Sequence, residues 1–237
     1  MILTTKNSIR EALNSGLTIN KVCVQIGAKD YEVQKLASLA RNKKIKVEYL
    51  PRNVLDKKYG KNQGITAETV EFEYSSVEEI LESAKSSLPF ILILDGINDP
   101  HNFGAIIRSA ECAGVHGIII PKDRAVAVND TVIKTSTGAV SNMKIARVSN
   151  INNEIEKLKK KGLWVWAAEA GGADIFKTNL NGPIAVVIGS EGKGVSKLTK
   201  EKCDGIISMP MLGKVNSLNA SVATGIVLFE ILRQRRG

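Results

Sequence analysis

Short alternating and amphipathic segments characterise the chain up to about residue 75. A helix is predicted over 31–42, because its apolar residues recur at helical spacing on one side: Val33, Leu36, Ala37 and Ala40. Further helices are predicted over 7–16 and 51–55, and strands over 21–26, 46–50 and 69–73. Together these segments predict a small α/β unit.

The pattern changes at Pro89, after which apolar residues follow one another without alternation. Near-continuous apolar runs cover 90–94, 117–120, 163–167 and 184–188. Such runs are typical of strands that are buried on both faces of a parallel sheet. The segments between them predict helices, so we expect an open α/β sheet; these helices cover 104–114, 130–135 and 151–161.

The stretch 75–88 joins the two patterns. It is polar, with one apolar stripe at helical spacing made by Val77, Ile80, Leu81 and Ala84. We interpret it as the connection between two domains. The first helix of the second domain would explain the stripe equally well.

Composition narrows the class of protein. A length of 237 residues suffices for two domains, and no apolar run approaches the roughly 20 residues that span a bilayer. The N-terminus does not have the layout of a signal peptide. Cys23, Cys112 and Cys203 are far apart, and His101 and His116 are the only histidines, so neither a disulfide framework nor a metal site is expected. These features predict a cytoplasmic protein with free thiols.

Charge points to a polyanionic partner. The chain carries a net charge of +9, and residues 1–75 hold 13 Lys and Arg against 8 Asp and Glu. A basic protein without a membrane segment commonly binds nucleic acid, although a merely soluble basic surface would give the same balance. Aromatic residues make up only 5% of the chain, which argues against a platform that stacks single-stranded bases.

Ligands of open α/β sheets bind beyond the carboxyl ends of the strands, and three segments of the second part are expected there. The first is 95–108, where Asn102 is placed just ahead of a helix and Arg108 within its first turns. This spacing lets Arg108 project near Asn102. The alternative is a surface arginine on the polar side of the helix, beside Glu111.

The second segment, 189–196, is rich in glycine. Gly189, Gly192 and Gly194 fit neither the dinucleotide-binding spacing nor the P-loop, and a plain tight turn is the alternative to a ligand-binding loop. Glu191 argues against a phosphate cradle, because a carboxylate repels an anion. Glycine at these positions would allow a ligand to approach the backbone closely.

The third segment, 209–225, precedes the last predicted helix. It contains Gly213, Asn216, Ser217, Asn219 and Ser221, and Ser and Asn favour helix caps over helix interiors. A polar loop at a helix N-terminus offers free N–H groups to a ligand. The three segments contain no histidine or cysteine placed as a nucleophile, so they favour the positioning of a polar group and a cofactor over covalent catalysis.

The three segments, in this order, resemble the three motifs of the SpoU (TrmH-like) RNA 2′-O-methyltransferases of the SPOUT superfamily. The matching residues are 102–108, 187–194 and 207–223, and the likeness covers 89–237. Residues 1–75 resemble more weakly the L30e-like substrate-binding domain of the branch that methylates a guanosine of 23S rRNA, through 7–16 and 60–65. The resemblance divides the chain into an RNA-binding domain (1–75), a linker (76–88) and a catalytic domain (89–237).

The resemblance implies a parallel sheet with a deep C-terminal trefoil knot, and a homodimer formed through the catalytic domain. It implies transfer of a methyl group from S-adenosylmethionine to a ribose 2′-OH. Arg108 would stabilise the developing alkoxide, because a guanidinium is hard to deprotonate. The residues that would hold Arg108 and the ribose are Asn102, Glu191, Ser217 and Asn219.

Backbone of five residues would bind the cofactor: Ile188, Gly189, Met209, Gly213 and Leu218. The RNA contacts would be made by the first domain through Lys43, Lys44, Lys46 and Arg52. Two alternatives stay open. One is an enzyme of the same family that acts on tRNA or on adenosine, and the other is a non-catalytic RNA-binding protein with the same fold.

Overall fold

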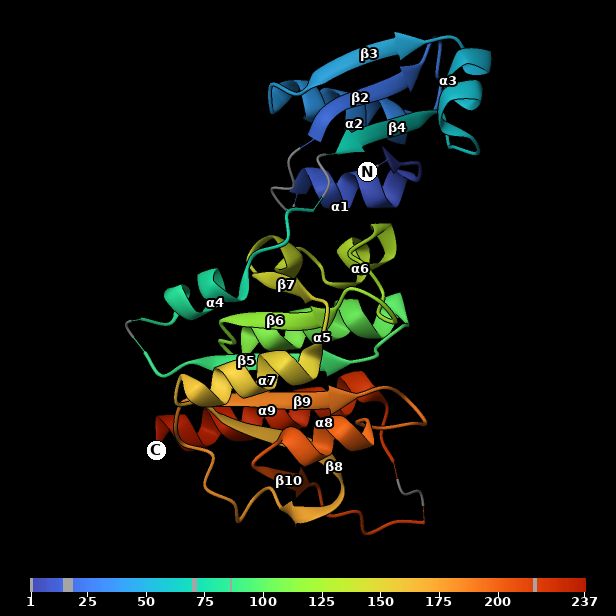
Figure 1. The fold of residues 1–237 in the computed structure, drawn as a ribbon. Coiled ribbons are helices and arrows are strands. Elements are labelled where there is room, and N and C mark those ends of the chain that lie inside the picture. The colour runs from blue at the N-terminus through green and yellow to red at the C-terminus, as the bar shows by residue number, and fades with distance from the viewer. Residues whose placement is uncertain (1, 15–18, 70–71, 86, 215–216) are drawn as a thin grey trace. The chain divides into compact units, whose positions relative to one another are not determined.

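The computed structural model describes residues 2–14, 19–69, 72–85, 87–214 and 217–237. The chain divides into two compact units (Figure 1). Unit 1 comprises Met1–Glu73 and Val128–Ser141, and unit 2 comprises Tyr74–Ala127 and Asn142–Gly237. None of the described helices is both long and apolar enough to cross a membrane.

Unit 1 contains a four-stranded sheet in the order β1-β4-β2-β3. Its strands are β1 (Ile2–Leu3), β2 (Ile19–Gln25), β3 (Lys46–Leu50) and β4 (Ile65–Thr69). Strand β2 runs parallel to β3 and antiparallel to β4. Its helices include α1 (Lys6–Asn14), α2 (Tyr31–Asn42) and α3 (Arg52–Tyr59). Helix α2 begins at the Asp30 cap and buries the predicted apolar stripe in the core of the unit.

Two predicted elements of unit 1 need correction. Strand β4 ends at Thr69, so the prediction over 69–73 is wrong for Phe72 and Glu73, and residues 70 and 71 lie outside the described part. Four of the five residues of β4 are buried, so the strand lacks the alternation that was sought. Helix α3 continues to Tyr59 and ends at Gly60, whose φ is 68°.

Unit 2 is built on a six-stranded sheet in the order β10-β8-β9-β5-β6-β7, in which every neighbouring pair is parallel. The predicted parallel sheet is therefore confirmed. Its strands are β5 (Phe90–Asp95), β6 (Gly117–Pro121), β7 (Ile145–Val148), β8 (Trp164–Asp174), β9 (Ile184–Gly189) and β10 (Gly205–Ser208). The two edge strands, β7 and β10, were not predicted, because each has only four residues and lacks a long apolar run.

Helices cover both faces of this sheet (Figure 1). On one face α5 (Pro100–Cys112) packs against α9 (Ala220–Arg236), and on the other α7 (Ile151–Lys160) packs beside α8 (Lys197–Lys202). The core on the α7 side joins Ile155 and Leu158 to Ile91 and Val187 of the central strands. The short helix α6 (Asp130–Thr135) belongs to the segment grouped with unit 1.

The stretch between the two patterns forms a helix, α4 (Val77–Ser83), that belongs to unit 2. A capping box starts it, in which Ser76 and Glu79 exchange hydrogen bonds. Val77 and Ile80 join the core of unit 2, and a Cβ on Gly117 would lie 2.5 Å from Ile80. These contacts support the second of the two interpretations, in which the stripe marks the first helix of the second domain.

Candidate active site

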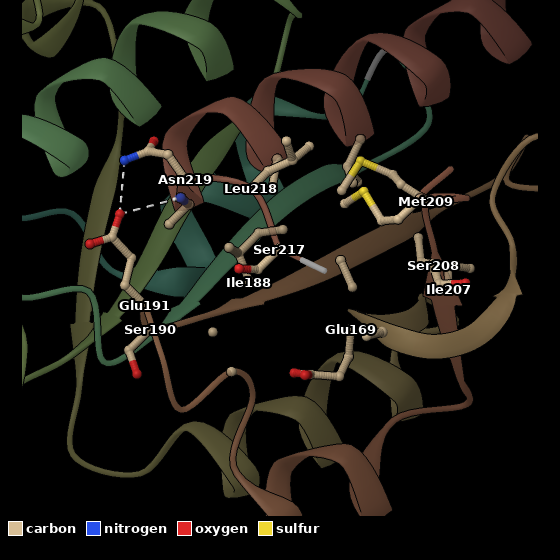
Figure 2. A pocket seen from close by; sticks show the side chains of 18 of the residues that line it. Glu169, Ile188, Ser190, Glu191, Ile207, Ser208, Met209, Ser217, Leu218 and Asn219 are labelled. Carbon is tan, nitrogen blue, oxygen red and sulfur yellow. Dashed lines mark hydrogen bonds between the residues drawn. The ribbon is translucent and has the colours of Figure 1, made fainter. Parts of the chain in front are cut away.

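A pocket of about 730 Å³ lies where β9 and β10 end and α9 begins (Figure 2). Strand β8 contributes Glu169, β9 contributes Ile188, and β10 contributes Ile207. The chain between β10 and α9 supplies Met209 and Leu218. The pocket is thus at the sheet edge where ligands of open α/β folds bind.

Three side chains from the three predicted segments meet beside this pocket, and we call Asn102, Glu191 and Asn219 the polar triad. The amide nitrogen of Asn102 donates to Oε1 of Glu191 at 2.8 Å. The amide nitrogen of Asn219 donates to the same oxygen at 2.8 Å and to Oδ1 of Asn102 at 2.9 Å. In Figure 2, Glu191 and Asn219 face one another on one side of the pocket. The triad therefore closes a ring of hydrogen bonds among residues far apart in the sequence.

Asn219 is fixed from two sides. It is the N-cap of α9, and its Oδ1 accepts hydrogen bonds from the backbone N–H groups of Ser221 at 2.9 Å and Val222 at 3.3 Å. This leaves its amide nitrogen directed at the other two members of the triad. The cap thus couples the start of the last helix to the geometry of the site.

Asn102 lies inside a helix, and the sequence prediction on this point is wrong. Helix α5 begins at Pro100, after the cap Asp99, whereas the prediction placed Asn102 ahead of a helix starting at Gly104. Pro is favoured at the first helical position, a signal that the prediction did not use. Asn102 is only 7% exposed, so its polar side chain depends on the triad for hydrogen-bond partners.

The glycine-rich segment folds back on itself directly after β9. Ser190 and Gly194 form an isolated antiparallel bridge, with Gly194 N–H donating to the Ser190 carbonyl at 2.9 Å. A Cβ on Gly189 would lie 2.0 Å from the carbonyl carbon of Gly194. Gly192 and Gly194 have φ values of 78° and 65°, in the left-handed region that favours glycine. Close packing and backbone conformation together require this glycine pattern.

Glu169 is a site residue that the sequence prediction missed. It is in β8, and one of its oxygens, Oε2, accepts a hydrogen bond from Val195 N–H at 2.8 Å. A Cβ on Gly194 would lie 2.3 Å from that same oxygen, so the carboxylate rests directly on the glycine-rich loop. Its side chain projects toward the pocket (Figure 2). The predicted strand ended at Ala167, which left the carboxyl end of β8 out of the search.

The other predicted residues are distributed as follows. The pocket is lined by the cofactor candidates Ile188, Gly189, Met209 and Leu218 and by the ribose candidate Ser217. Gly213 is exposed and does not line it, and Asn216 lies outside the described residues.

Arg108 does not reach the pocket in a single chain. It is exposed on α5, and it makes no hydrogen bond or ion pair with any described residue. This position agrees with the alternative stated for it, a surface arginine.

The candidate RNA contacts are all in unit 1. Lys43, Lys44 and Lys46 are exposed around the turn between α2 and β3. Arg52 is tied to its own unit, because its Nε donates to Asp56 at 2.8 Å. None of the three lysines forms a close ion pair with a described carboxylate, although Glu48 lies within electrostatic reach of Lys46, so together they present a positive surface.

Comparison with known proteins agrees with this architecture. Residues 89–229 match the SpoU rRNA methylase family, and residues 6–75 match a domain described as RNA 2′-O ribose methyltransferase substrate binding. A relative from Bacillus subtilis (strain 168), named as a TrmH family tRNA/rRNA methyltransferase, is 43% identical over 97% of this chain and 94% of its own.

Solved structures share the fold. The SpoU methyltransferase AviRb from Streptomyces viridochromogenes, in complex with AdoMet, superposes with a TM-score of 0.78 at 22% identity, over 100% of this chain and 90% of that one. A structure described as an RNA 2′-O ribose methyltransferase has a TM-score of 0.67 at 26% identity, over 100% and 89%. The chain belongs to the SpoU/TrmH family of RNA methyltransferases, which use S-adenosylmethionine as the methyl donor.

Proposed function

We propose that this protein transfers the methyl group of S-adenosylmethionine to a ribose 2′-OH of RNA, and that its target is a guanosine of 23S rRNA. The observation that carries the proposal is the polar triad, which joins all three segments at the side of the pocket. The substrate-binding family match supports RNA as the partner and the 2′-OH as the acceptor. The likeness of residues 1–75 to the rRNA branch supports the guanosine target.

The pocket suits the cofactor. Its volume is within the range of about 300–1,000 Å³ that is typical of small-molecule sites. Ile188 and Leu218 offer apolar contacts to an adenine, and the absence of a side chain at Gly189 lets the backbone of Gly194 and Val195 pack against this wall of the pocket. We assign Ile188, Gly189, Met209 and Leu218 to the cofactor; Gly213, which does not line the pocket, is the weakest of the predicted set. When bound, the cofactor supplies a methyl group that is already activated on a sulfonium.

The protein's own task is then alignment and charge control at the ribose oxygen. The triad fixes the Glu191 carboxylate by two amide donors, so its second oxygen has a defined position beside the pocket. We assign Glu191, Asn102, Asn219 and Ser217 to the positioning of the ribose and of Arg108. Arg108 supplies positive charge to the oxygen as the hydroxyl proton passes to water and the methyl group leaves the sulfur.

The exposed position of Arg108 supports a homodimer. Val222, Ile226 and Phe229 are 51%, 37% and 48% exposed at helical spacing on α9, which packs against α5. A second copy packed on this apolar face would bring the neighbouring Arg108 into an interface. We also expect the family's C-terminal trefoil knot and the L30e-like fold of the first domain.

The proposed function is tested by incubating the protein and labelled S-adenosylmethionine with purified 23S rRNA and tRNA. Label is expected in 23S rRNA, at a nucleotide that digestion identifies as 2′-O-methylguanosine. Label confined to tRNA, or recovered as 2′-O-methyladenosine, would establish the alternative within the family. RNA binding with no cofactor binding by calorimetry would indicate the non-catalytic alternative.

Reversing the charge of Lys43, Lys44 and Lys46 to Glu is expected to weaken rRNA binding by at least tenfold at moderate salt. Each contact between a lysine and a phosphate releases counterions, so the slope of log affinity against log salt should become shallower. Fluorescence anisotropy over a salt series measures both quantities. As a matched pair, Lys43→Glu should weaken binding, whereas Lys85→Glu, an exposed lysine of unit 2, should not. Unchanged affinity of the triple variant would exclude this surface as the RNA contact.

Glu169→Gln is expected to weaken S-adenosylmethionine binding about tenfold while affecting S-adenosylhomocysteine little. The cofactor carries a sulfonium charge that the demethylated product lacks, and a carboxylate about 4 Å away stabilises such a charge by about 1–4 kcal/mol. Glutamine keeps an acceptor for Val195 N–H, so the loop should stay in place. Calorimetry with both ligands measures the ratio, with Glu201→Gln, an exposed carboxylate of α8, as the control. Equal weakening of the two ligands would show that Glu169 acts only on the loop.

A further inference from the structure

A second cavity, of about 410 Å³, opens at the amino end of β8 and contains both tryptophans of the chain. We call it the tryptophan groove. Its walls are Trp164, Trp166, Asn179, Leu180, Asn181 and Pro183. The strand that forms one wall continues into the cofactor pocket, and Trp164 lies roughly 15 Å along it from Glu169. The groove is thus separate from the pocket described above but shares a strand with it.

Aromatic residues are too few for a platform that stacks several bases, but the two indoles form an open aromatic surface large enough for one. Trp164 and Trp166 are two residues apart, so they are on the same face of β8, opposite Val165, which joins the core on the α7 side. Trp166 packs over Gly205, where a Cβ would lie 2.4 Å from the ring. Strand β10 begins at Gly205, opposite Trp166, so β10 does not extend alongside Trp164. Trp164 is 59% exposed, which is unusual for the largest apolar side chain.

The opposite wall is held in place by hydrogen bonds, so the groove is preformed. The backbone N–H of Leu180 donates to the side-chain oxygen of Gln234 in α9 at 2.8 Å. The backbone N–H of Trp164 donates to the Pro183 carbonyl at 2.9 Å. The guanidinium of Arg235 donates to the Gly182 carbonyl at 2.5 Å. Asn179 and Asn181 are exposed on this wall, and each carries an amide that can both donate and accept hydrogen bonds.

Charge around the groove is positive. Two carboxylates next in sequence to residues that support the groove are already paired: Asp204 with Lys159 at 2.8 Å and Glu230 with Arg233 at 2.9 Å. Two cations next to the groove in sequence, Lys161 and Arg236, form no ion pair in the described parts of the chain. Lys160 interacts with Glu156, and Arg235 donates to three backbone carbonyls. An anionic ligand is therefore favoured over a neutral or cationic one.

We propose that the tryptophan groove binds an unpaired base of RNA, stacked on Trp164, with the flanking phosphates facing the unpaired cations. An aromatic ring can stack on any base, a side-chain amide can form hydrogen bonds with the edge of a base, and a cation can bind a backbone phosphate. Single-stranded RNA is a ligand that makes all three kinds of contact. A protein interface would also combine an aromatic centre with a polar rim, but the unpaired cations beside this groove favour a polyanion over a protein surface of mixed charge. The proposal requires RNA as a partner but does not depend on methyl transfer.

Intrinsic fluorescence reports directly on this site, because the groove contains every tryptophan of the chain. A short single-stranded oligoadenylate is expected to quench the emission to saturation, whereas a duplex of the same length, with its bases already stacked, should quench far less. Quenching should persist with the cofactor pocket saturated by S-adenosylmethionine, since the two sites are distinct. Absence of quenching by the single strand at saturation would overturn the proposal.

Variants assign the effect to Trp164. Trp164→Ala, read through the remaining Trp166, should weaken binding of the oligoadenylate about tenfold, and Trp164→Phe should recover part of the loss. Phe176→Ala, which removes an aromatic ring 52% exposed outside the groove, is the matched control and should change nothing. Equal affinity of Trp164→Ala and the unmodified protein would refute base stacking. A change in oligomeric state of Trp164→Ala by light scattering would instead identify the occupant as protein and also refute it.

Discussion

Arg108→Ala is expected to reduce methyl transfer by at least a hundredfold while leaving S-adenosylmethionine binding unchanged. Preorganised charge directed at a developing oxyanion typically contributes this much to the rate. The cofactor should not sense the change, because Arg108 is exposed and does not line the pocket. Loss of an exposed side chain also has little effect on the free energy of unfolding. Single-turnover transfer and calorimetry measure the two quantities separately.

Because Arg108 is exposed and away from the pocket of its own chain, mixing two inactive variants can test whether it acts on the site of a second chain. Arg108→Lys keeps the charge but not the planar fork, so it should retain part of the activity. If Arg108 acts across a dimer, mixing inactive Arg108→Ala with inactive Asn102→Ala should restore about a quarter of the activity, because half of the dimers then contain one intact site. Light scattering should give twice 25.6 kDa for the unmodified protein. Full activity of Arg108→Ala would eliminate its proposed role.

Gly189→Ala is expected to lower cofactor affinity by at least tenfold and to lower the Tm by several degrees. The added Cβ would lie 2.0 Å from the carbonyl carbon of Gly194 and 2.1 Å from the nitrogen of Val195, and both are backbone atoms that cannot rotate away. Overpacking of this kind costs about 1–3 kcal/mol, and each kcal/mol lowers the Tm by about 2–4 °C in a chain of this size.

Gly182→Ala is the matched control for this substitution. A Cβ on Gly182 meets no atom within 4 Å, and its φ is outside the left-handed region, so cofactor affinity and Tm should stay as they are. If Gly189→Ala binds the cofactor within twofold of the unmodified protein, the loop is more compliant than its packing indicates. The assignment of Gly189 to the cofactor would then be withdrawn.

The sequence predicted those helices and strands whose own pattern of apolar residues agrees with their burial in the folded protein. Helix α2 and strand β3 have the predicted bounds, and the four long apolar runs became β5, β6, β8 and β9. The short edge strands escaped detection, because the burial of β7 and β10 comes from neighbours on one side and from helices distant in sequence. The position of β4 was also missed. This strand lies between two others and is buried at nearly every position, so its sequence lacks the alternation of polar and apolar residues on which the prediction depended.

The candidate site divides in the same way. Residue types and strand ends were enough to select Asn102, Glu191 and Asn219, because polar residues beyond the strands of a parallel sheet meet at one edge. The hydrogen bonds that join them depend on where α5 starts, a boundary misplaced by several residues. Glu169 was missed because its role depends on contact with Gly194, 25 positions later in the chain, which no local pattern contains.

The polar triad also determines at which point of synthesis the candidate site can form. Asn219 bonds to Asn102 across 117 positions, and Asn102 bonds to Glu191 across 89. A chain emerging during synthesis cannot form the triad until its last helix begins, however well its earlier strands have folded. Incomplete chains that end before Asn219 therefore cannot form the triad. Methyl transfer is therefore expected only from chains that extend into α9.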